Sequence, residues 1–153
     1  MTLPSSAPDL TQRAPRSPRL RLGGYALLPR ILDKVRALNA GTNGTYQYGL
    51  RRMDRHFLNF LGIDPDALQA AAKLGGGDGE LLAWVEANAK TPRQPWEIAA
   101  WSAWLEARGP DSDAETLADF AAAVGENSKT REDIRTWFDL LDLDDHVTFG
   151  GKA

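Results

Sequence analysis

The chain has 153 residues, of which 42% are hydrophobic and 25% are charged, and its formal net charge is −3. This length suits one domain around a single core, and no apolar run approaches the roughly 20 residues that cross a bilayer. The absence of cysteine excludes disulfides, thiolate nucleophiles, iron–sulfur clusters and the usual structural zinc sites. We predict no cofactor and no membrane partner, and the acidic balance argues against nucleic acid.

The chain opens with a proline-rich segment. Residues 1–18 hold four of the nine prolines and lack hydrophobic periodicity, which predicts an extended or disordered arm, and residues 19–153 are predicted to form one domain. No apolar signal segment is present, so we predict a cytoplasmic location. A helix over 29–40 follows the arm, because Pro29 suits a first helical position and Gly41 can end the helix. Alternation at Tyr46 and Tyr48 predicts a minimal β-hairpin or strand around 45–49.

Capping and helix-ending residues divide the rest of the chain into further helical segments. Their expected first residues or caps are Asp54, Asp64, Asp78, Pro95, Ser112 and Thr130. Apolar stripes predict burial for Leu32, Val35, Phe57, Leu61, Trp84, Ile98, Trp101, Leu117, Phe120, Trp137 and Leu141. The sequence therefore predicts an all-α fold, a single compact domain of six to seven short helices with an extended N-terminal arm.

Charge is segregated along the chain. Residues 1–36 contain seven Lys or Arg and two Asp, a net +5, whereas residues 111–145 contain 11 Asp or Glu and three Lys or Arg, a net −8. Opposed blocks of this kind can dock on each other, hold a symmetric partner or mark separate ion sites. We therefore expect the basic arm to contact the acidic segment.

The sharpest chemical candidate lies in residues 139–146, where four carboxylates and an imidazole fall within eight residues. This set could bind a hard cation or transfer protons, although it departs from an EF-hand. Carboxylates near a helix C-terminus oppose the helix dipole, so docked arginines are the expected compensation. The candidate residues are Asp142, Asp144, Asp145 and His146, together with Asp139.

Three arginines of the arm are the counterpart. Arg16, Arg19 and Arg21 are spaced by two or three residues on a backbone expected to be extended, and their guanidinium groups suit carboxylates or phosphates. We predict that they dock on Asp142, Asp144 or Asp145. A phosphate or another anionic small molecule is the alternative partner.

Two further groups complete the ligand or interface candidates. Trp96 and Trp104 lie eight residues apart on a common helical face, where they could line a cleft or an interface. The polar residues of the first helix are expected on its exposed side in ordinary surface pairs, with a pocket role as the alternative. They are Arg30, Asp33, Lys34 and Arg36, and Tyr25 precedes them.

Several blocks, in order along nearly the whole chain, resemble the small bacterial proteins of the domain-of-unknown-function 5069 family. These blocks are residues 16–25 (RSPRLRLGGY), 28–34 (LPRILDK), 60–64 (FLGID), 95–102 (PWEIAAWS), 108–111 (RGPD) and 137–145 (WFDLLDLDD). The resemblance implies a single-domain bacterial protein. It transfers no mechanism, because the family carries no established activity, ligand or catalytic residues.

The sequence favours a binding or interaction module whose basic N-terminal arm is docked on an acidic C-terminal segment. Its partner could be a second copy, giving a homo-oligomer, or an anionic small molecule. The alternative is a small-molecule enzyme with an Asp/His/Arg cluster, with or without a divalent metal. Its candidate residues are Tyr25, Arg30, Asp33, Lys34, Asp142 and His146, and no catalytic role is assigned because nothing specifies a reaction.

Overall fold

The computed structural model describes residues 7–153, and this part of the chain forms seven helices and one short β-hairpin. In chain order the elements are β1 (Arg21–Leu22), β2 (Tyr25–Ala26), α1 (Leu28–Ala40), α2 (Arg52–Leu61), α3 (Pro65–Lys73), α4 (Asp78–Asn88), α5 (Pro95–Ala107), α6 (Ala114–Asn127) and α7 (Trp137–Thr148). The prediction of an all-α fold is confirmed. None of these helices has the length and apolar character that a bilayer crossing requires.

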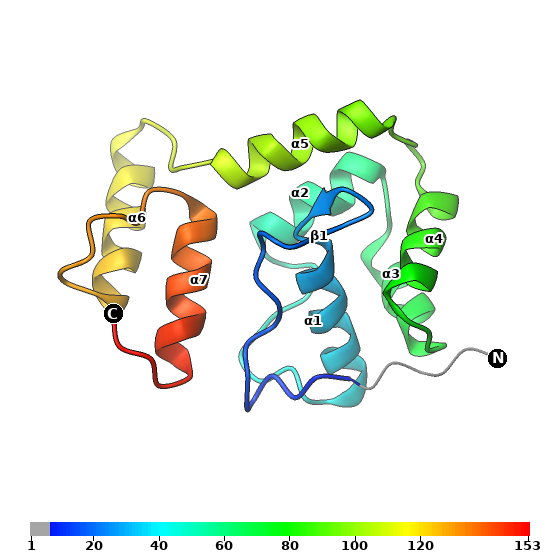
Figure 1. Cartoon of the computed structure of the whole chain (residues 1–153), viewed down its shortest axis with the longest axis horizontal. Helices are drawn as coiled ribbons and strands as arrows, with labels where there is room; N and C mark the ends of the chain where they lie inside the picture. Colours follow the sequence, from blue (N-terminus) through cyan, green and yellow to red (C-terminus); the bar gives the residue numbers. More distant parts are fainter. Residues whose placement is uncertain (1–6) are drawn as a thin grey trace.

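Helix α1 stands at the centre of the fold (Figure 1). The α3 and α4 helices lie on one side of it, the α6–α7 hairpin lies on the other, and α5 crosses above them. Every residue from Leu28 to Ala37 is buried, so α1 has no solvent-facing side along most of its length. The helix ends as predicted at Gly41, whose φ of 72° supplies the left-handed conformation of the cap.

The β-hairpin is not where the sequence predicted it. Strand β1 pairs with β2 in antiparallel register, and the turn residues Gly23 and Gly24 have φ of 60° and 84°. A two-residue hairpin turn with positive φ at both positions favours glycine, so the Gly23–Gly24 pair was the sequence feature that marked the hairpin. The strand predicted around 45–49 is wrong, because that segment forms turns and bends in which the Asn43 side chain donates a hydrogen bond to the Tyr46 carbonyl.

The proline-marked helix starts are confirmed, whereas three expected caps are wrong. Helices α3 and α5 begin at Pro65 and Pro95. Helix α2 begins before Asp54, whose side chain is fully buried rather than at a cap. Helix α6 is capped by Asp113 rather than by Ser112. Helix α7 begins at Trp137 instead of near Thr130, since a capping box at Thr136 starts it.

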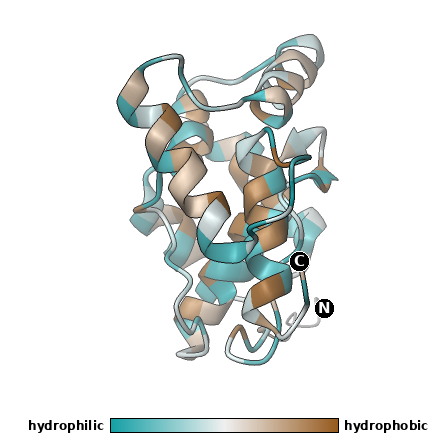
Figure 2. Cartoon of the chain, turned by 90° about the vertical axis from the view of Figure 1, so that its left-hand side faces the viewer, coloured by the Kyte–Doolittle hydropathy of each residue, from teal (hydrophilic) through white to brown (hydrophobic). Residues whose placement is uncertain are grey.

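The predicted core is fully or partly buried, with one exception. The prediction that Leu117 is buried is wrong. This side chain is 47% exposed, because α6 packs mainly against α7 and buries only Phe120. Figure 2 faces this hairpin and shows hydrophobic and hydrophilic turns following each other along its helices. Buried as predicted are Leu32, Val35, Phe57, Leu61, Ile98 and Phe120, whereas Trp84, Trp101, Trp137 and Leu141 are only partly buried.

The described part of the arm is attached to the body. Leu10 is only 2% exposed, and its backbone N–H donates to the Thr42 carbonyl at 2.8 Å. The Thr42 hydroxyl in turn donates to the Pro8 carbonyl at 2.8 Å. Residues 1–6, which the sequence also assigned to the arm, lie outside the described residues.

Candidate functional site

The charged residues of α1 are buried, so the expectation that they form ordinary surface pairs is wrong. Arg30, Asp33, Lys34 and Arg36 are only 4–7% exposed. Each meets an oppositely charged side chain that comes from another segment of the chain. Burial of charge is tolerated when it is paired and hydrogen-bonded, and here α1 is where these pairs converge.

Lys34 anchors the loop before α2. Its Nζ lies 2.7 Å from both carboxylate oxygens of Asp54. The same carboxylate accepts a hydrogen bond from the Gly49 backbone N–H at 2.9 Å. Burial lowers the pKa of Lys34, and the Asp54 charge opposes that effect. The pair fixes the loop and the start of α2 against α1.

Arg30 connects α1 to α7. Its guanidinium donates to both oxygens of Asp145 at 2.7 and 3.2 Å, and the Tyr46 hydroxyl donates to the same carboxylate at 2.8 Å. Burial raises the pKa of Tyr46, and the bond to Asp145 adds to this effect, which keeps the hydroxyl a neutral donor. Helix α7 is thereby held to the body at a point where little solvent reaches.

The predicted contact between the basic arm and the acidic segment is confirmed. Arg19 donates to Asp142 at 3.0 Å and also pairs with Asp139. The Ser17 hydroxyl donates to Asp142 at 2.8 Å, so the arm and α7 share several polar contacts. Asp144, the third expected partner, makes no ion pair with any residue of 7–153.

The other two arm arginines have different partners from those predicted. Arg16 pairs with Asp33 at 3.1 Å and with Asp78 at 2.7 Å, and Arg36 joins the same Asp78 carboxylate. The hydrogen bond from Arg16 is the main reason that the pKa of Asp78 is lowered. Arg21 pairs with Glu106 of α5 at 3.1 Å.

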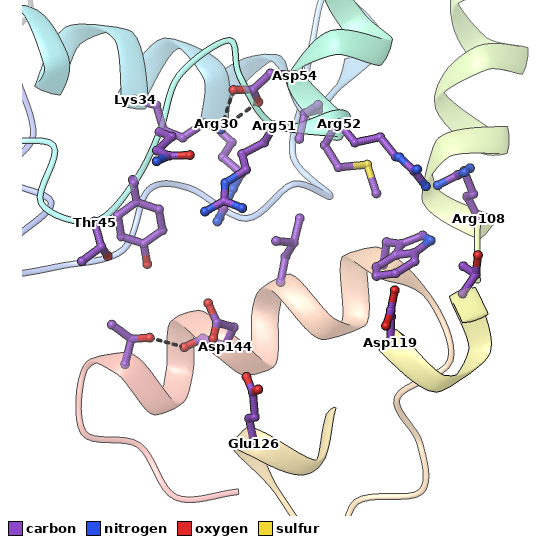
Figure 3. A pocket seen from close by; sticks show the side chains of 18 residues that line it. Arg30, Lys34, Thr45, Arg51, Arg52, Asp54, Arg108, Asp119, Glu126 and Asp144 are labelled. Carbon is purple, nitrogen blue, oxygen red and sulfur yellow. Dashed lines mark hydrogen bonds and ion pairs between the residues drawn. The ribbon is translucent and has the colours of Figure 1, made fainter. Parts of the chain in front are cut away.

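A cleft of about 770 Å³ lies between the body and the α6–α7 hairpin (Figure 3). Two of the sequence-predicted candidates from α1, Arg30 and Lys34, lie in its wall, as does Asp144 from α7. The complete lining is Leu27, Arg30, Lys34, Thr45, Tyr46, Gln47, Arg51, Arg52, Met53, Asp54, Arg108, Thr116, Asp119, Glu126, Trp137, Leu141, Asp144 and Thr148.

One wall of the cleft is basic. Arg51 and Arg52 are exposed, and neither side chain makes an ion pair or a hydrogen bond with any residue of 7–153. Arg108 stands on the same wall, and its Nη1 is buried without a hydrogen-bond partner in the described chain. The Arg51 and Arg52 guanidinium groups are available to an anion, unlike those of Arg16 and Arg19, whereas Arg108 pairs with Asp111 at 3.8 Å.

The start of α2 adds to the positive character of this wall. The N-cap residue is Arg51, and no side chain caps the helix. The carboxylate of Asp54, the acidic residue of the first turn, accepts hydrogen bonds from Lys34 and from the Gly49 N–H rather than capping the helix. The free N–H groups of a first helical turn carry partial positive charge, which favours a negative group nearby.

A family model described as "Domain of unknown function (DUF5069)" matches residues 12–147. The chain belongs to the DUF5069 family. This confirms the resemblance predicted from the sequence blocks. No curated protein matches the chain. The family description names no reaction or ligand, so the function of this DUF5069 chain has to be argued from its own residues.

The remaining candidates of this DUF5069 chain lie outside the cleft. Tyr25 lines a separate hollow of about 490 Å³ with Arg21 and Arg93. His146 is exposed and lines another hollow with Pro15 and Ser17 of the arm, and its Nε2 lies 3.1 Å from the Lys152 carbonyl oxygen. Trp96 and Trp104 of α5 are 72% and 47% exposed, and the Trp104 ring packs edge-to-face on His56 of α2 with ring centroids 5.4 Å apart.

The residues of the enzyme hypothesis therefore do not converge. Tyr25, Arg30 and His146 belong to three different hollows, and Asp142 is engaged by the arm. Within residues 7–153, no three His, Asp or Glu side chains lie close enough together to hold a metal ion.

Sequence reasoning missed most of the cleft, because only Arg30, Lys34 and Asp144 of its lining were among the candidates. Arg51, Arg52 and Arg108 were not proposed, nor were Asp119 and Glu126 of α6. One signal was present: Thr116, Asp119 and Glu126 recur at helical spacing along a face of α6 that carries no core residue. The Arg51–Arg52 pair gave no comparable signal, because its role depends on where the preceding loop places it.

Proposed function

We propose that this protein is a binding module that holds a small charged molecule in the cleft, with an anionic group of the ligand against Arg51 and Arg52. One observation carries the proposal: these two arginines face the cleft without a partner in the described chain, whereas Arg16, Arg19 and Arg30 are each paired with a carboxylate. The uncapped start of α2 supports it.

The docked arm holds the α6–α7 hairpin, which forms the second wall of the cleft, in position. Arg19 and Ser17 hold Asp142 of α7, and the Arg16 carbonyl accepts a hydrogen bond from Arg30 at 3.3 Å. These contacts connect the arm, α1 and α7. In our proposal the basic arm serves as an internal strap, which keeps the hairpin at a fixed distance from the arginine wall rather than binding the ligand itself.

The test is an amide NMR titration with inorganic phosphate and with caproate. We expect both anions to shift the amide signals of residues 51–54. Replacing both guanidinium groups, Arg51→Gln with Arg52→Gln, should raise Kd by about tenfold or more, since each charge-assisted hydrogen bond contributes roughly 1.5–3 kcal/mol.

The matched control is Arg55→Gln, an exposed arginine of the same helix that does not line the cleft. It should bind both anions like the wild type. Equal affinity in the double variant, or shifts confined to other surfaces, would show that the arginine wall is not the anion site.

We also propose that the chain forms a homo-oligomer, because α5 carries two exposed tryptophans. Trp96 and Trp104 are exposed on one face of this helix, and Ala100 lies midway between them. Large exposed aromatic side chains are characteristic of protein interfaces. Sedimentation equilibrium should give a larger mass for the wild type than for Trp96→Ser with Trp104→Ser. The bacterial source and the cytoplasmic location also remain proposals, based on the sequence alone.

A further inference from the structure

The wall opposite the arginines is acidic. Asp119 and Glu126 of α6 and Asp144 of α7 line the cleft. Figure 3 shows these carboxylates across the opening from Arg51 and Arg52. None of the three carboxylates makes an ion pair with any residue between 7 and 153. The cleft therefore presents two unpaired arginines, Arg51 and Arg52, on one wall and three unpaired carboxylates on the other.

This arrangement is unusual for this chain. Elsewhere the opposed charges of the arm, α1 and α7 meet directly, as in Arg19–Asp142 and Arg30–Asp145. Across the cleft they are too far apart to pair. A purely anionic ligand would be attracted by one wall and repelled by the other, and a purely cationic ligand would face the reverse problem.

We infer that the cleft binds a zwitterionic ligand, whose anionic group contacts Arg51 and Arg52 and whose ammonium or guanidinium group contacts Asp119 and Glu126. This inference rests on the proposed function and names the ligand class for the same site. Only a molecule that carries both charges, with its negative group at the basic wall and its positive group at the acidic wall, is complementary to the whole cleft.

The apolar residues of the lining indicate what separates the two charged groups. Met53, Trp137 and Leu141 line the cleft, and their partly exposed side chains offer apolar surface. An uncharged, largely aliphatic segment buries its area there without leaving a polar group unpaired. The ligand class is thus an ω-amino acid or a compound with the same charge placement.

The probes are γ-aminobutyrate and ε-aminocaproate, each compared with the carboxylate that lacks the amine, butyrate or caproate. Amide NMR titration of the full chain gives Kd for each. We expect at least one zwitterion to bind about tenfold more tightly than its matched carboxylate, which is the size expected for one added charge-assisted contact.

The deciding variant is Asp119→Asn with Glu126→Gln. Both side chains are exposed, so the fold should be retained. Removing the acidic wall should weaken binding of the zwitterion and strengthen binding of the simple carboxylate, which reverses or abolishes the preference. Glu132→Gln, an exposed residue outside the cleft, should change neither affinity. If the double variant does not fold, Asp144→Asn serves the same purpose.

The outcomes separate this inference from the proposed function. Carboxylates that bind and are lost in Arg51→Gln with Arg52→Gln, without any preference for the zwitterion, would overturn the zwitterionic ligand and leave the anion-binding module intact. An unchanged preference in the acidic-wall variant would also overturn it. Absence of binding by every probe would overturn both.

Discussion

Asp145 is the residue at which three parts of the molecule meet. Its carboxylate accepts hydrogen bonds from Arg30 of α1 and from the Tyr46 hydroxyl, and it is only 8% exposed. Replacing it by alanine would leave the Arg30 guanidinium buried without its counter-charge. We expect Asp145→Ala to lower the free energy of unfolding by about 3–5 kcal/mol, measured by urea denaturation.

The exposed Arg131–Asp133 pair is the control. Its atoms approach to 2.6 Å, yet 67% of the Asp133 side chain is accessible. We expect Asp133→Asn to lower the free energy of unfolding far less than Asp145→Ala does, because solvent screens an exposed pair. Similar losses for the two variants would contradict the view that burial decides the contribution of these ion pairs.

At the scale of single residues, the sequence predicted charge type but not burial. Arg30, Asp33 and Lys34 occupy the polar side of a helix with a clear apolar stripe, which usually indicates solvent. Their partners Asp145, Arg16 and Asp54 come from three distant segments. No local pattern identifies such partners, so α1 could not be recognised from the sequence as a fully enclosed helix.

At the scale of elements, α7 depends on its N-terminal capping box. The Thr136 hydroxyl accepts from the Asp139 N–H at 3.1 Å, and the Asp139 carboxylate accepts from the Thr136 N–H at 3.0 Å. We expect Thr136→Ala to lower the free energy of unfolding by about 1 kcal/mol. Thr130→Ala, at the cap that the sequence predicted wrongly, should change it by less than about 0.5 kcal/mol.

Some helix boundaries could be predicted from the sequence and others could not. Pro65 and Pro95 mark helix starts because proline lacks the N–H that a first turn leaves free, and Gly41 and Gly62 mark ends because of their positive φ. Threonine and aspartate recur through residues 111–136, so several capping patterns compete there. The choice among them depends on how α7 packs, which local sequence does not contain.

The α6–α7 hairpin should open more easily than the body. Helix α6 buries only Phe120 and packs mainly on α7, whereas α1 is enclosed along ten consecutive residues. Elements with few buried apolar contacts open at lower free energy. Native-state hydrogen exchange should therefore give lower opening free energies for α6 amides than for α1 amides. Equal values would mean that the hairpin and the body unfold only together.

At the scale of the whole molecule, the segregated charges join distant segments of the chain. The +5 block of residues 1–36 meets the −8 block of residues 111–145 through Arg19–Asp142 and Arg30–Asp145, so the two blocks partly neutralise each other within the fold. Arg16 and Arg21 pair instead with Asp78 and Glu106, outside the acidic block. The contact between the two blocks was predictable from charge alone. The cleft was not, because its lining comes from α1, the loop before α2, the end of α5 and the α6–α7 hairpin, and only their packing brings these segments together.

These contacts imply a loss of stability in acid. The hydrogen bond from Arg16 lowers the pKa of Asp78, and Arg36 acts in the same direction. Burial opposes ionisation of Asp139, but the Arg135 and Thr136 N–H groups outweigh it, so its pKa is also lowered. A carboxyl group with a lower pKa in the folded state stabilises the fold above its unfolded pKa, about 3.9 for Asp. That stabilisation disappears as pH falls through the folded pKa.

Urea denaturation between neutral pH and pH of about 2 should therefore show stability falling steadily once the pH is below about 5. Asp78→Asn removes one titrating group that binds fewer protons in the folded state. We expect this variant to be less stable than the wild type at neutral pH but to lose less on acidification, because the slope against pH reports the difference in bound protons. Thr130→Ala, which removes no titrating group, should keep the wild-type slope. A slope in Asp78→Asn as steep as that of the wild type would show that the arm and α4 do not contribute to acid unfolding through this carboxylate.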